Sequence, residues 1–276
     1  YIHGIHFIST KPNFFLRKII RSSLSDLYCK GIKPHSYFLS VSINKNLISK
    51  KWLGKVKKIL KSEQKKFKVV LSGGDTTQST KLSVTLAVIG YSKVKPVLRS
   101  GCKVNDDIYV TGNIGDSFLG LCIIKKKFNF GKLNNFFMKK FYEPEIPFKL
   151  QPYLHKIANS SIDVSDGLLQ DLSHICLFKK FGASIDLQKL PLSAHCRYLV
   201  NNGKIKIQNI FSNGDDYQFL FTSSVNNRKK IERLSNNLNV KITKIGKINN
   251  KKIITFKNND KIYDARSIKM GYMHNF

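Results

Sequence analysis

Acidic residues are rare in this chain, and several of them lie close together. Only 17 aspartates and glutamates accompany 48 lysines and arginines. Neighbouring carboxylates repel one another unless a cation lies between them, and Mg²⁺ is usually held by one or two carboxylates together with the phosphates of a substrate. The clustering therefore predicts a magnesium and phosphate site built from six aspartates in three glycine-flanked segments: Asp75, Asp163, Asp166, Asp171, Asp215 and Asp216.

The densest cluster reads Ile-Asp-Val-Ser-Asp-Gly-Leu-Leu-Gln-Asp. We expect a strand to end at Asp163 and a helix to begin at Asp166, so that both carboxylates converge on one ion while the Ser165 hydroxyl binds phosphate. Helix capping is the alternative and is worth about 1 kcal/mol, but it accounts for one polar residue and not for Asp163 as well. Asp171 falls inside the helix, where we expect it either to support the site from behind or to face solvent.

Two glycine-containing turns could also hold phosphate. Gly73 and Gly74 follow a short apolar strand and precede Asp75, and glycine lets the backbone approach a polyphosphate closely because it has no Cβ. We therefore favour a nucleotide or metal role for Gly74 and Asp75 over a simple turn. The segment 112–117 leads into a helix, whose free N–H groups can bind an anion. Two glycines alone are a weak signal, so an ordinary strand-to-helix turn is preferred there.

The elements that position these residues follow from hydrophobic periodicity. The first third predicts helices over 13–30 and around 52–60, and strands over 37–43, 69–71 and 82–91. The remainder predicts strands from 107 and over 217–222 and 240–248, and helices from 118, over 147–159, from 166 to a stop at Gly182, and in a lysine-rich segment after 222. The pattern mixes α and β. Sheet patterning stops at 93–96, which favours two domains, 1–95 and 96–276.

Composition restricts the class of protein. Hydrophobic residues make up 42% of the 276 residues, enough for packed cores, and no apolar run approaches the roughly 18 residues of a membrane-spanning helix. Five widely spaced cysteines without a Cys-x-x-Cys pair favour reduced, buried thiols and indicate a cytoplasmic protein. The opening residues do not have the pattern of a signal peptide.

The formal charge of +31 would ordinarily indicate nucleic-acid binding. However, the lysines are spread along the whole chain, and no motif of a nucleic-acid-binding module is visible. Abundant Lys, Asn and Ile are what an AT-rich genome encodes, so we attribute much of the charge to composition and expect no specific nucleic-acid partner. The positive field still attracts anionic substrates such as nucleotides.

Several segments, in order, resemble the thiamine-monophosphate kinases, a family related to aminoimidazole ribonucleotide synthetase and selenophosphate synthetase. The resemblance runs from Tyr1 to Phe276, and its Asp-x-Ser-Asp-Gly-Leu segment separates this family from its relatives. The main motifs are Gly-Gly-Asp-Thr-Thr at Asp75, Asp-Val-Ser-Asp-Gly-Leu from Asp163 and Gly-Asp-Asp-Tyr at Asp215. The other matching segments are Gly4-Ile-His6-Phe7, Leu24-Ser-Asp26-Leu, Leu98-Arg99-Ser-Gly101 and Gly271-Tyr272-Met-His274.

Carried over position by position, the resemblance implies magnesium ligands at Asp26, Asp75, Asp163 and Asp166. It implies ATP contacts at Gly74, Asp75, Arg99 and Ser165. It implies contacts to thiamine monophosphate at His6, Asp215 and Tyr272, and catalytic roles for Asp75, Asp163 and Arg99.

The fold implied by the resemblance is α+β, with two domains of a synthetase-like architecture. An N-terminal mixed sheet with helices would form the interface of a homodimer, with nucleotide bound near that interface. A C-terminal α/β sandwich-like domain would complete the active site.

Two positions depart from the family pattern. Asp215 stands where a glutamate is usual, and Ser79 stands where a glycine is common. The family also has a Gly-Asp-Asp metal motif, and an Asp-Thr pair, before the position that Tyr1 occupies. We therefore expect the chain to be part of a longer protein whose preceding segment completes the metal cluster.

The expected activity is ATP-dependent phosphorylation of thiamine monophosphate to thiamine diphosphate. A phosphate monoester has a second pKa of about 6, so the acceptor is anionic near neutral pH and needs no general base. Catalysis is then expected from positioning and from charge neutralisation by magnesium and Arg99, without a phosphoenzyme. Two alternatives stay open: another ATP-dependent synthetase of the same superfamily, and a non-catalytic basic nucleic-acid-binding protein.

Overall fold

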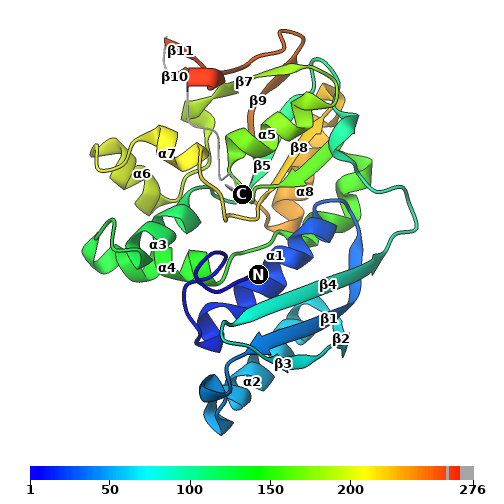
Figure 1. Cartoon of the computed structure of the whole chain (residues 1–276). Coiled ribbons are helices and arrows are strands. Elements are labelled where there is room, and N and C mark those ends of the chain that lie inside the picture. Colours follow the sequence, from blue (N-terminus) through cyan, green and yellow to red (C-terminus); the bar gives the residue numbers. More distant parts are fainter. Residues whose placement is uncertain (259–260, 268–276) are drawn as a thin grey trace.

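The computed structural model describes residues 1–258 and 261–267. Its strands form two sheets, and helices pack against both (Figure 1). A four-stranded sheet is built from residues up to Tyr91, and a seven-stranded sheet from later residues. The predicted mixture of α and β is confirmed.

Strand β1 (Lys33–Ile43) is the centre of the first sheet. β4 (Ser83–Tyr91) pairs antiparallel with it from Lys33 to Ser42, whereas β2 (Val70–Gly73) and β3 (Thr76–Gln78) both run parallel to it. Because β4 occupies one edge of β1 along nearly its whole length, β2 and β3 share the other edge. They behave as one strand that is interrupted at residues 74 and 75, where the sequence predicts phosphate or metal chemistry.

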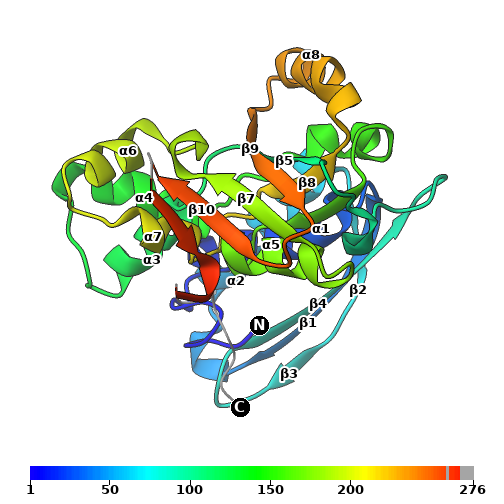
Figure 2. The same ribbon diagram turned by 90° about the horizontal axis from the view of Figure 1, so that it is seen from above.

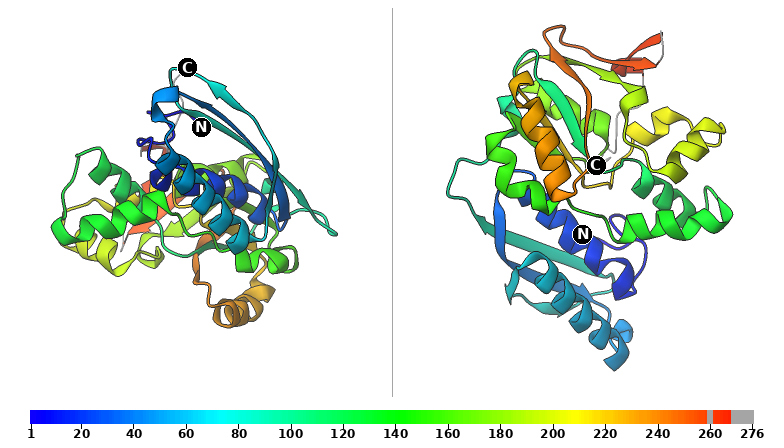
Figure 3. Two further views of the ribbon diagram at one scale, coloured as in Figure 1. Left: turned by 90° about the horizontal axis from the view of Figure 1, so that it is seen from below. Right: turned by 180° about the vertical axis from the view of Figure 1, so that it is seen from behind.

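Two helices cover one face of this sheet. α1 (Leu16–Tyr28) and α2 (Lys50–Phe67) lie on the same side, and no described helix lies on the other side (Figures 2 and 3). α2 begins after Ser49, whose hydroxyl accepts a hydrogen bond from Trp52 N–H at 3.1 Å. Such a cap satisfies one of the N–H groups that a helix start leaves without a partner.

The seven-stranded sheet has the order β11-β10-β7-β9-β5-β8-β6. Only β7 and β10 pair parallel; the other neighbours are antiparallel. Since β6 is an edge strand that ends at Asp163, it carries this carboxylate to the margin of the sheet. The strands are β5 (Asp107–Thr111), β6 (Ser160–Asp163), β7 (Gly182–Asp186), β8 (Phe219–Ser223), β9 (Ile242–Asn249), β10 (Ile254–Asn258) and β11 (Lys261–Asp264).

The two faces of the larger sheet belong to different cores. One face packs with helices of the C-terminal half around Ile108 and Leu220. The other face, with Tyr109 and Phe221, shares a second core with α1 and α2, and this core joins the two sheets. The helices of the C-terminal half are α3 (Asp116–Ile124), α4 (Asn134–Tyr142), α5 (Leu168–Leu177), α6 (Ala194–Asn201), α7 (Ile207–Phe211) and α8 (Arg228–Leu238).

Most elements lie close to where periodicity predicts them, with several differences. α5 begins at Leu168, two residues after the predicted start at Asp166. The segment expected as a helix over 147–159 is a 3-10 helix, Phe148–Lys156, with Pro152 inside it; proline has no N–H for an α-helical hydrogen bond. α5 ends at Leu177, so Gly182 begins β7 instead of ending the helix. α3 begins at Asp116, two residues before the predicted start.

Two further sequence observations can be compared with the structure. All five cysteines are buried and have free thiols, as predicted. Within residues 1–258 and 261–267, no helix has the length and hydropathy that crossing a membrane requires.

Candidate active site

Asp163 lies at the end of β6 against the last turn of α1. It is 3% exposed, and burial together with the negative charge of Asp26 raises the pKa of its carboxyl to about 6. Asp26 belongs to α1, and its side chain keeps contact with solvent. Burial by the surrounding protein also raises the pKa of Asp26, while the charges of Lys30 and Arg99 oppose that rise. The fold thus brings two predicted metal ligands together from distant segments.

Two cations flank this carboxylate pair. Arg99 is exposed and lies in a 3-10 turn, Arg99–Gly101, where its charge acts on both Asp26 and Lys30. The Lys30 ammonium donates a hydrogen bond to the Ser161 carbonyl oxygen, and burial lowers the pKa of Lys30. Sequence reasoning missed Lys30, although its place four residues after Asp26 is the spacing at which helical side chains become neighbours.

Asp171 holds the turn between β6 and α5 from inside. Its Oδ2 accepts the backbone N–H groups of Ser165, Asp166 and Gly167 at 3.0, 3.1 and 3.2 Å. At 1% exposure it is not a surface acid. Burial, followed by the charges of Asp163 and Asp166, raises the pKa of Asp171 to about 8. One ligand atom each of Asp166, Asp171 and His174 lies within 4.8 Å of the others, so the turn gathers further donors that suit a cation.

The loop 213–217 is attached to the same turn through its backbone. Asp215 N–H donates to the Ser165 carbonyl and Tyr217 N–H to the Val164 carbonyl, each at 2.8 Å. A Cβ on Gly214 would lie 2.0 Å from the Ser165 oxygen, so this close approach requires glycine. Two of the sequence motifs therefore become one structural unit.

A cavity of about 310 Å³ lies beside this loop. His6, Ser165, Asp166 and Asp215 are among its polar lining residues, and the His6 Nδ1 accepts a hydrogen bond from Ile2 N–H at 3.0 Å. Two of the three predicted contacts to thiamine monophosphate, His6 and Asp215, therefore line one cavity. Tyr272, the third, lies outside the described residues. Apolar lining comes from Ile5, Ile8, Ile19, Phe118, Leu121 and Phe141.

The second aspartate of the Gly-Asp-Asp-Tyr motif has a different task. Asp216 is 6% exposed, and its carboxylate accepts the N–H groups of Gly115 at 2.7 Å and Ser117 at 3.3 Å. Both N–H groups lie at the start of α3, where the sequence left open the binding of a phosphate. A carboxylate at a helix start satisfies these donors and favours the helix dipole. This pairing fits the preferred interpretation of segment 112–117 as an ordinary strand-to-helix turn. The carboxylate of Asp216 also explains why α3 begins two residues earlier than predicted.

Gly74 and Asp75 lie on the first sheet, at the break between β2 and β3. A Cβ on Gly74 would come within 1.8 Å of the Leu39 carbonyl oxygen, and its φ is +153°, so glycine is required there as well. Asp75 is exposed, and its Oδ1 accepts the Thr76 N–H at 2.7 Å. Both residues line a cavity of about 580 Å³ whose other walls come from the sheet and from α2, including Trp52 and Val56.

The four predicted metal ligands are not gathered equally in this chain. Asp26 and Asp163 are neighbours, and Asp166 follows on the next turn. Asp75 lies between β2 and β3 and lines the cavity of about 580 Å³, whereas Asp166 lines the cavity of about 310 Å³.

Comparisons with known proteins identify relatives of this chain. The family described as AIR synthase related protein, N-terminal domain, matches residues 1–92. The thiamine-monophosphate kinase of Buchnera aphidicola subsp. Schizaphis graminum is 36% identical over 253 residues, which cover 90% of this chain and 76% of that protein.

Solved structures share the fold. A thiamine-monophosphate kinase from Stenotrophomonas maltophilia has a TM-score of 0.85 at 25% identity, covering 95% of this chain and 84% of that one. AaThiL complexed with AMPPCP and TMP has a TM-score of 0.82 at 24% identity, with the same two coverages. The identity and coverage of the Buchnera protein show that the chain belongs to the thiamine-monophosphate kinase family.

Proposed function

We propose that the chain transfers the γ-phosphoryl group of ATP to thiamine monophosphate and so forms thiamine diphosphate and ADP. The observation that carries this proposal is the meeting of Asp26, Asp163 and Arg99 next to the turn with Ser165 and Asp166. This turn also lines the cavity that contains His6 and Asp215. The proposed metal ligands, the proposed phosphate-binding cation and the proposed acceptor pocket therefore adjoin one another.

Magnesium suits the carboxylates of this site. Asp163 is almost fully buried beside Asp26, and the pKa of each carboxyl is raised. A cation between the two carboxylates would stabilise their charged forms. Oxygen donors are the ligands that Mg²⁺ prefers. We infer that Asp26, Asp163 and Asp166 hold Mg²⁺ here and that Asp75 is a further ligand. Bound magnesium would offset the negative charge of the ATP phosphates.

The nucleotide is proposed to use the break in the first sheet. Gly74 packs closely against the Leu39 backbone, and Gly74 and Asp75 both line the cavity at this break. The adjoining cavity of about 580 Å³ has apolar walls of the kind that hold the ring system of a small ligand. Arg99 and Ser165 are the proposed contacts to the phosphates.

Thiamine monophosphate is proposed to occupy the cavity of about 310 Å³. Its apolar walls suit the two rings of the substrate, and Asp215 suits an amino group or a positive charge on them. His6 and Tyr272 are the other proposed contacts. Ser165 and Asp166 also line this cavity, and the acceptor phosphate is proposed to face them.

The reaction needs little from the protein in covalent terms. An oxygen of the acceptor phosphate forms a bond to the γ-phosphorus, the bond from that phosphorus to the β,γ-bridging oxygen breaks, and ADP leaves. The acceptor is already ionised near pH 7, so none of the carboxylates has to act as a base. Arg99, together with magnesium where the carboxylates hold it, would reduce the repulsion between two polyanions, and the cavity walls would fix their alignment.

We propose that the active unit is a homodimer formed through the first sheet. The pairing register gives Phe38, Val70, Ile89 and Tyr91 the same face of the sheet, and these side chains are 43, 56, 43 and 68% exposed. Exposed apolar patches of this kind are typical of interfaces. Sedimentation velocity of the protein decides between a dimer and a monomer.

We also propose that the chain has two domains, 1–95 and 96–276, and that the protein is cytoplasmic.

Turnover is the direct test. The protein is incubated with ATP, Mg²⁺ and thiamine monophosphate, and thiamine diphosphate is measured by chromatography after oxidation to a fluorescent product. We expect formation of thiamine diphosphate with one ADP released per product. Release of ADP with an aminoimidazole precursor, and none with thiamine monophosphate, would instead favour the synthetase alternative.

The large positive charge leads to a separate prediction. We expect DNA binding to be independent of sequence, with Kd no tighter than about 1 µM at physiological salt, and to weaken steeply as salt rises, because it rests on phosphate contacts alone. Fluorescence anisotropy with several duplexes of different sequence, at three salt concentrations, measures this. Nanomolar binding to one sequence with clear preference over random DNA would contradict it.

A further inference from the structure

Lys18 is a buried cation at the wall of the acceptor cavity. It belongs to α1, is 4% exposed and lines the cavity beside Asp215 and Phe141. Its Nζ lies 2.8 Å from Asp215 Oδ1 and 3.4 Å from the centre of the Phe141 ring. Burial lowers the pKa of Lys18, whereas the neighbouring Asp215 raises it. An ammonium taken out of water at this depth needs a partner, and Asp215 is that partner.

The two carboxylate oxygens of Asp215 have different surroundings. Oδ1 lies beside the Lys18 ammonium and also accepts the Tyr217 hydroxyl at 3.0 Å. Oδ2 has no hydrogen-bond or ion-pair partner among the described residues. The Asp215 side chain is 27% exposed, so it reaches the cavity, whereas the Lys18 Nζ atom is enclosed by protein. Lys18 therefore stands behind Asp215 and does not face a ligand.

The loop that carries Asp215 needs such a restraint. Asp215 and Tyr217 have φ values of 71° and 54°, in the left-handed region, which costs a non-glycine residue of order 1 kcal/mol or more. Two backbone hydrogen bonds hold the loop to the β6–α5 turn, but they leave the carboxylate itself free to rotate. The contacts of Oδ1 with Lys18 and Tyr217 fix that rotation.

We propose that Lys18 is a positioning residue for the acceptor: its ion pair with Asp215 Oδ1 directs Oδ2 into the cavity, where it receives a hydrogen-bond donor or positive charge from the ring system of the substrate. The inference rests on the proposed function, since it takes thiamine monophosphate as the occupant. It assigns Lys18 to the binding of the acceptor and not to that of ATP.

The test compares Lys18→Met with the wild type. We expect the KM for thiamine monophosphate to rise by about 10- to 100-fold, the range for loss of one charge-assisted hydrogen bond. The KM for ATP and the kcat should stay within about twofold. Arg17→Met is the matched control, because Arg17 is the preceding residue on α1 and also forms ion pairs, with Glu63 and Glu143, but does not line the cavity. Its KM for thiamine monophosphate should not change by more than about twofold.

A double-mutant cycle separates positioning from a general structural effect. Asp215→Asn alone should raise the same KM by a similar factor, and Lys18→Met with Asp215→Asn should be no worse than the worse single variant. Multiplicative effects, or an unchanged KM in a Lys18→Met protein with wild-type melting temperature, would overturn the inference. If Lys18→Met folds poorly, Lys18→Gln replaces it, and a KM equal to that of the wild type again rejects the role.

Calorimetric titration with thiamine monophosphate, without ATP, distinguishes this inference from the proposed function. If the wild-type protein binds thiamine monophosphate but does not phosphorylate it, the proposed function is rejected. The Kd values of the wild type and of Lys18→Met then still decide the role of Lys18. A wild-type protein that does not bind thiamine monophosphate would reject both.

Discussion

Replacing Asp163 by asparagine is expected to lower kcat by at least about 100-fold while the protein stays folded. The asparagine side chain has the same shape but no charge, so a metal held by Asp163 and Asp26 would lose the charge of one of its carboxylate ligands. Losses of this size follow removal of one preorganised electrostatic contact to the transition state. The measurement is steady-state turnover of thiamine monophosphate over a wide range of magnesium concentrations.

The same variant has an expected effect on stability of the opposite sign. The pKa of Asp163 is about 6 in the folded protein and about 3.9 in an unfolded chain. The folded state therefore binds the proton more tightly, and the contribution of Asp163 to stability is lost as pH rises from about 4 through 6. Without magnesium at pH 7.5, Asp163→Asn removes that unfavourable charge, so its melting temperature should equal or exceed that of the wild type.

Two further variants make this prediction specific. Asp186→Asn is the control, because Asp186 pairs with Lys189 at the surface, far from the cluster in sequence and outside the cavities that carry the proposal; its kcat should be unchanged. Asp75→Asn should also lose most turnover if Asp75 is a ligand as proposed. Near-normal rates for Asp163→Asn at every magnesium concentration would remove Asp163 from the set of metal ligands.

The sequence predicted the parts of the site that lie within single motifs. A strand followed by Asp-Val-Ser-Asp-Gly and an apolar helical pattern is typical of a strand-to-helix turn, so the positions of Asp163 and Ser165 could be expected. The pairing of Asp26 with Asp163 could not be derived from spacing, because it depends on how α1 packs against the edge of the second sheet. It entered only through the resemblance to a family, as did the roles of His6 and Arg99.

Buried charged side chains could not be predicted from the sequence. Lys18 is one of 48 lysines and arginines, and in a helical pattern it is indistinguishable from cations that face solvent. Asp216 was counted with the metal-site aspartates, yet it satisfies the start of α3. In each case the partner comes from a distant segment, so neither periodicity nor local spacing carries the signal.

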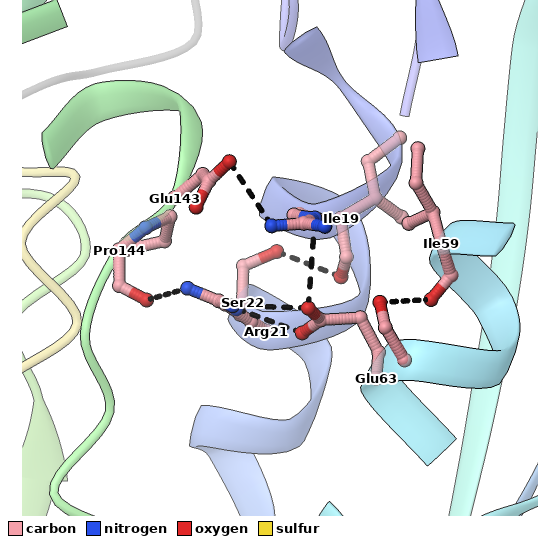
Figure 4. A network of polar contacts seen from close by, with 9 residues as sticks. Ile19, Arg21, Ser22, Ile59, Glu63, Glu143 and Pro144 are labelled. Atoms are coloured by element: carbon pink, nitrogen blue, oxygen red, sulfur yellow. Dashed lines mark hydrogen bonds and ion pairs between the residues drawn. The ribbon is translucent and has the colours of Figure 1, made fainter. Parts of the chain in front are cut away.

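Glu63 is the clearest example, since the rest of the polar residues of its helix, α2, are mostly lysines. It is 2% exposed and forms a bidentate ion pair with Arg21, itself 5% exposed, at 2.8 and 2.9 Å (Figure 4). Arg21 also donates to the Pro144 carbonyl at 3.1 Å. Arg17 lies 3.7 Å from Glu63 and donates to Glu143 at 3.1 Å. The network fastens α1 and α2 to the segment after α4.

Replacing Arg21 by methionine is therefore expected to destabilise the protein by about 3–5 kcal/mol, because removing one partner leaves the other charge buried without compensation. Arg17 cannot replace the lost contacts, since it reaches only one oxygen of Glu63 and is itself partly exposed. The free energy of unfolding is measured by urea titration, with equal slopes required for the comparison.

The matched comparisons test whether burial is the cause. Glu143→Gln removes an ion pair at the edge of the same network, where both side chains are about 30% exposed, and it should cost less than about 1 kcal/mol. The double variant Arg21→Met with Glu63→Met replaces both buried charges by apolar side chains, and it should recover most of the loss. If Arg21→Met costs no more than Glu143→Gln, the pair is effectively solvated, and the attachment of α1 to α2 rests on the apolar core alone.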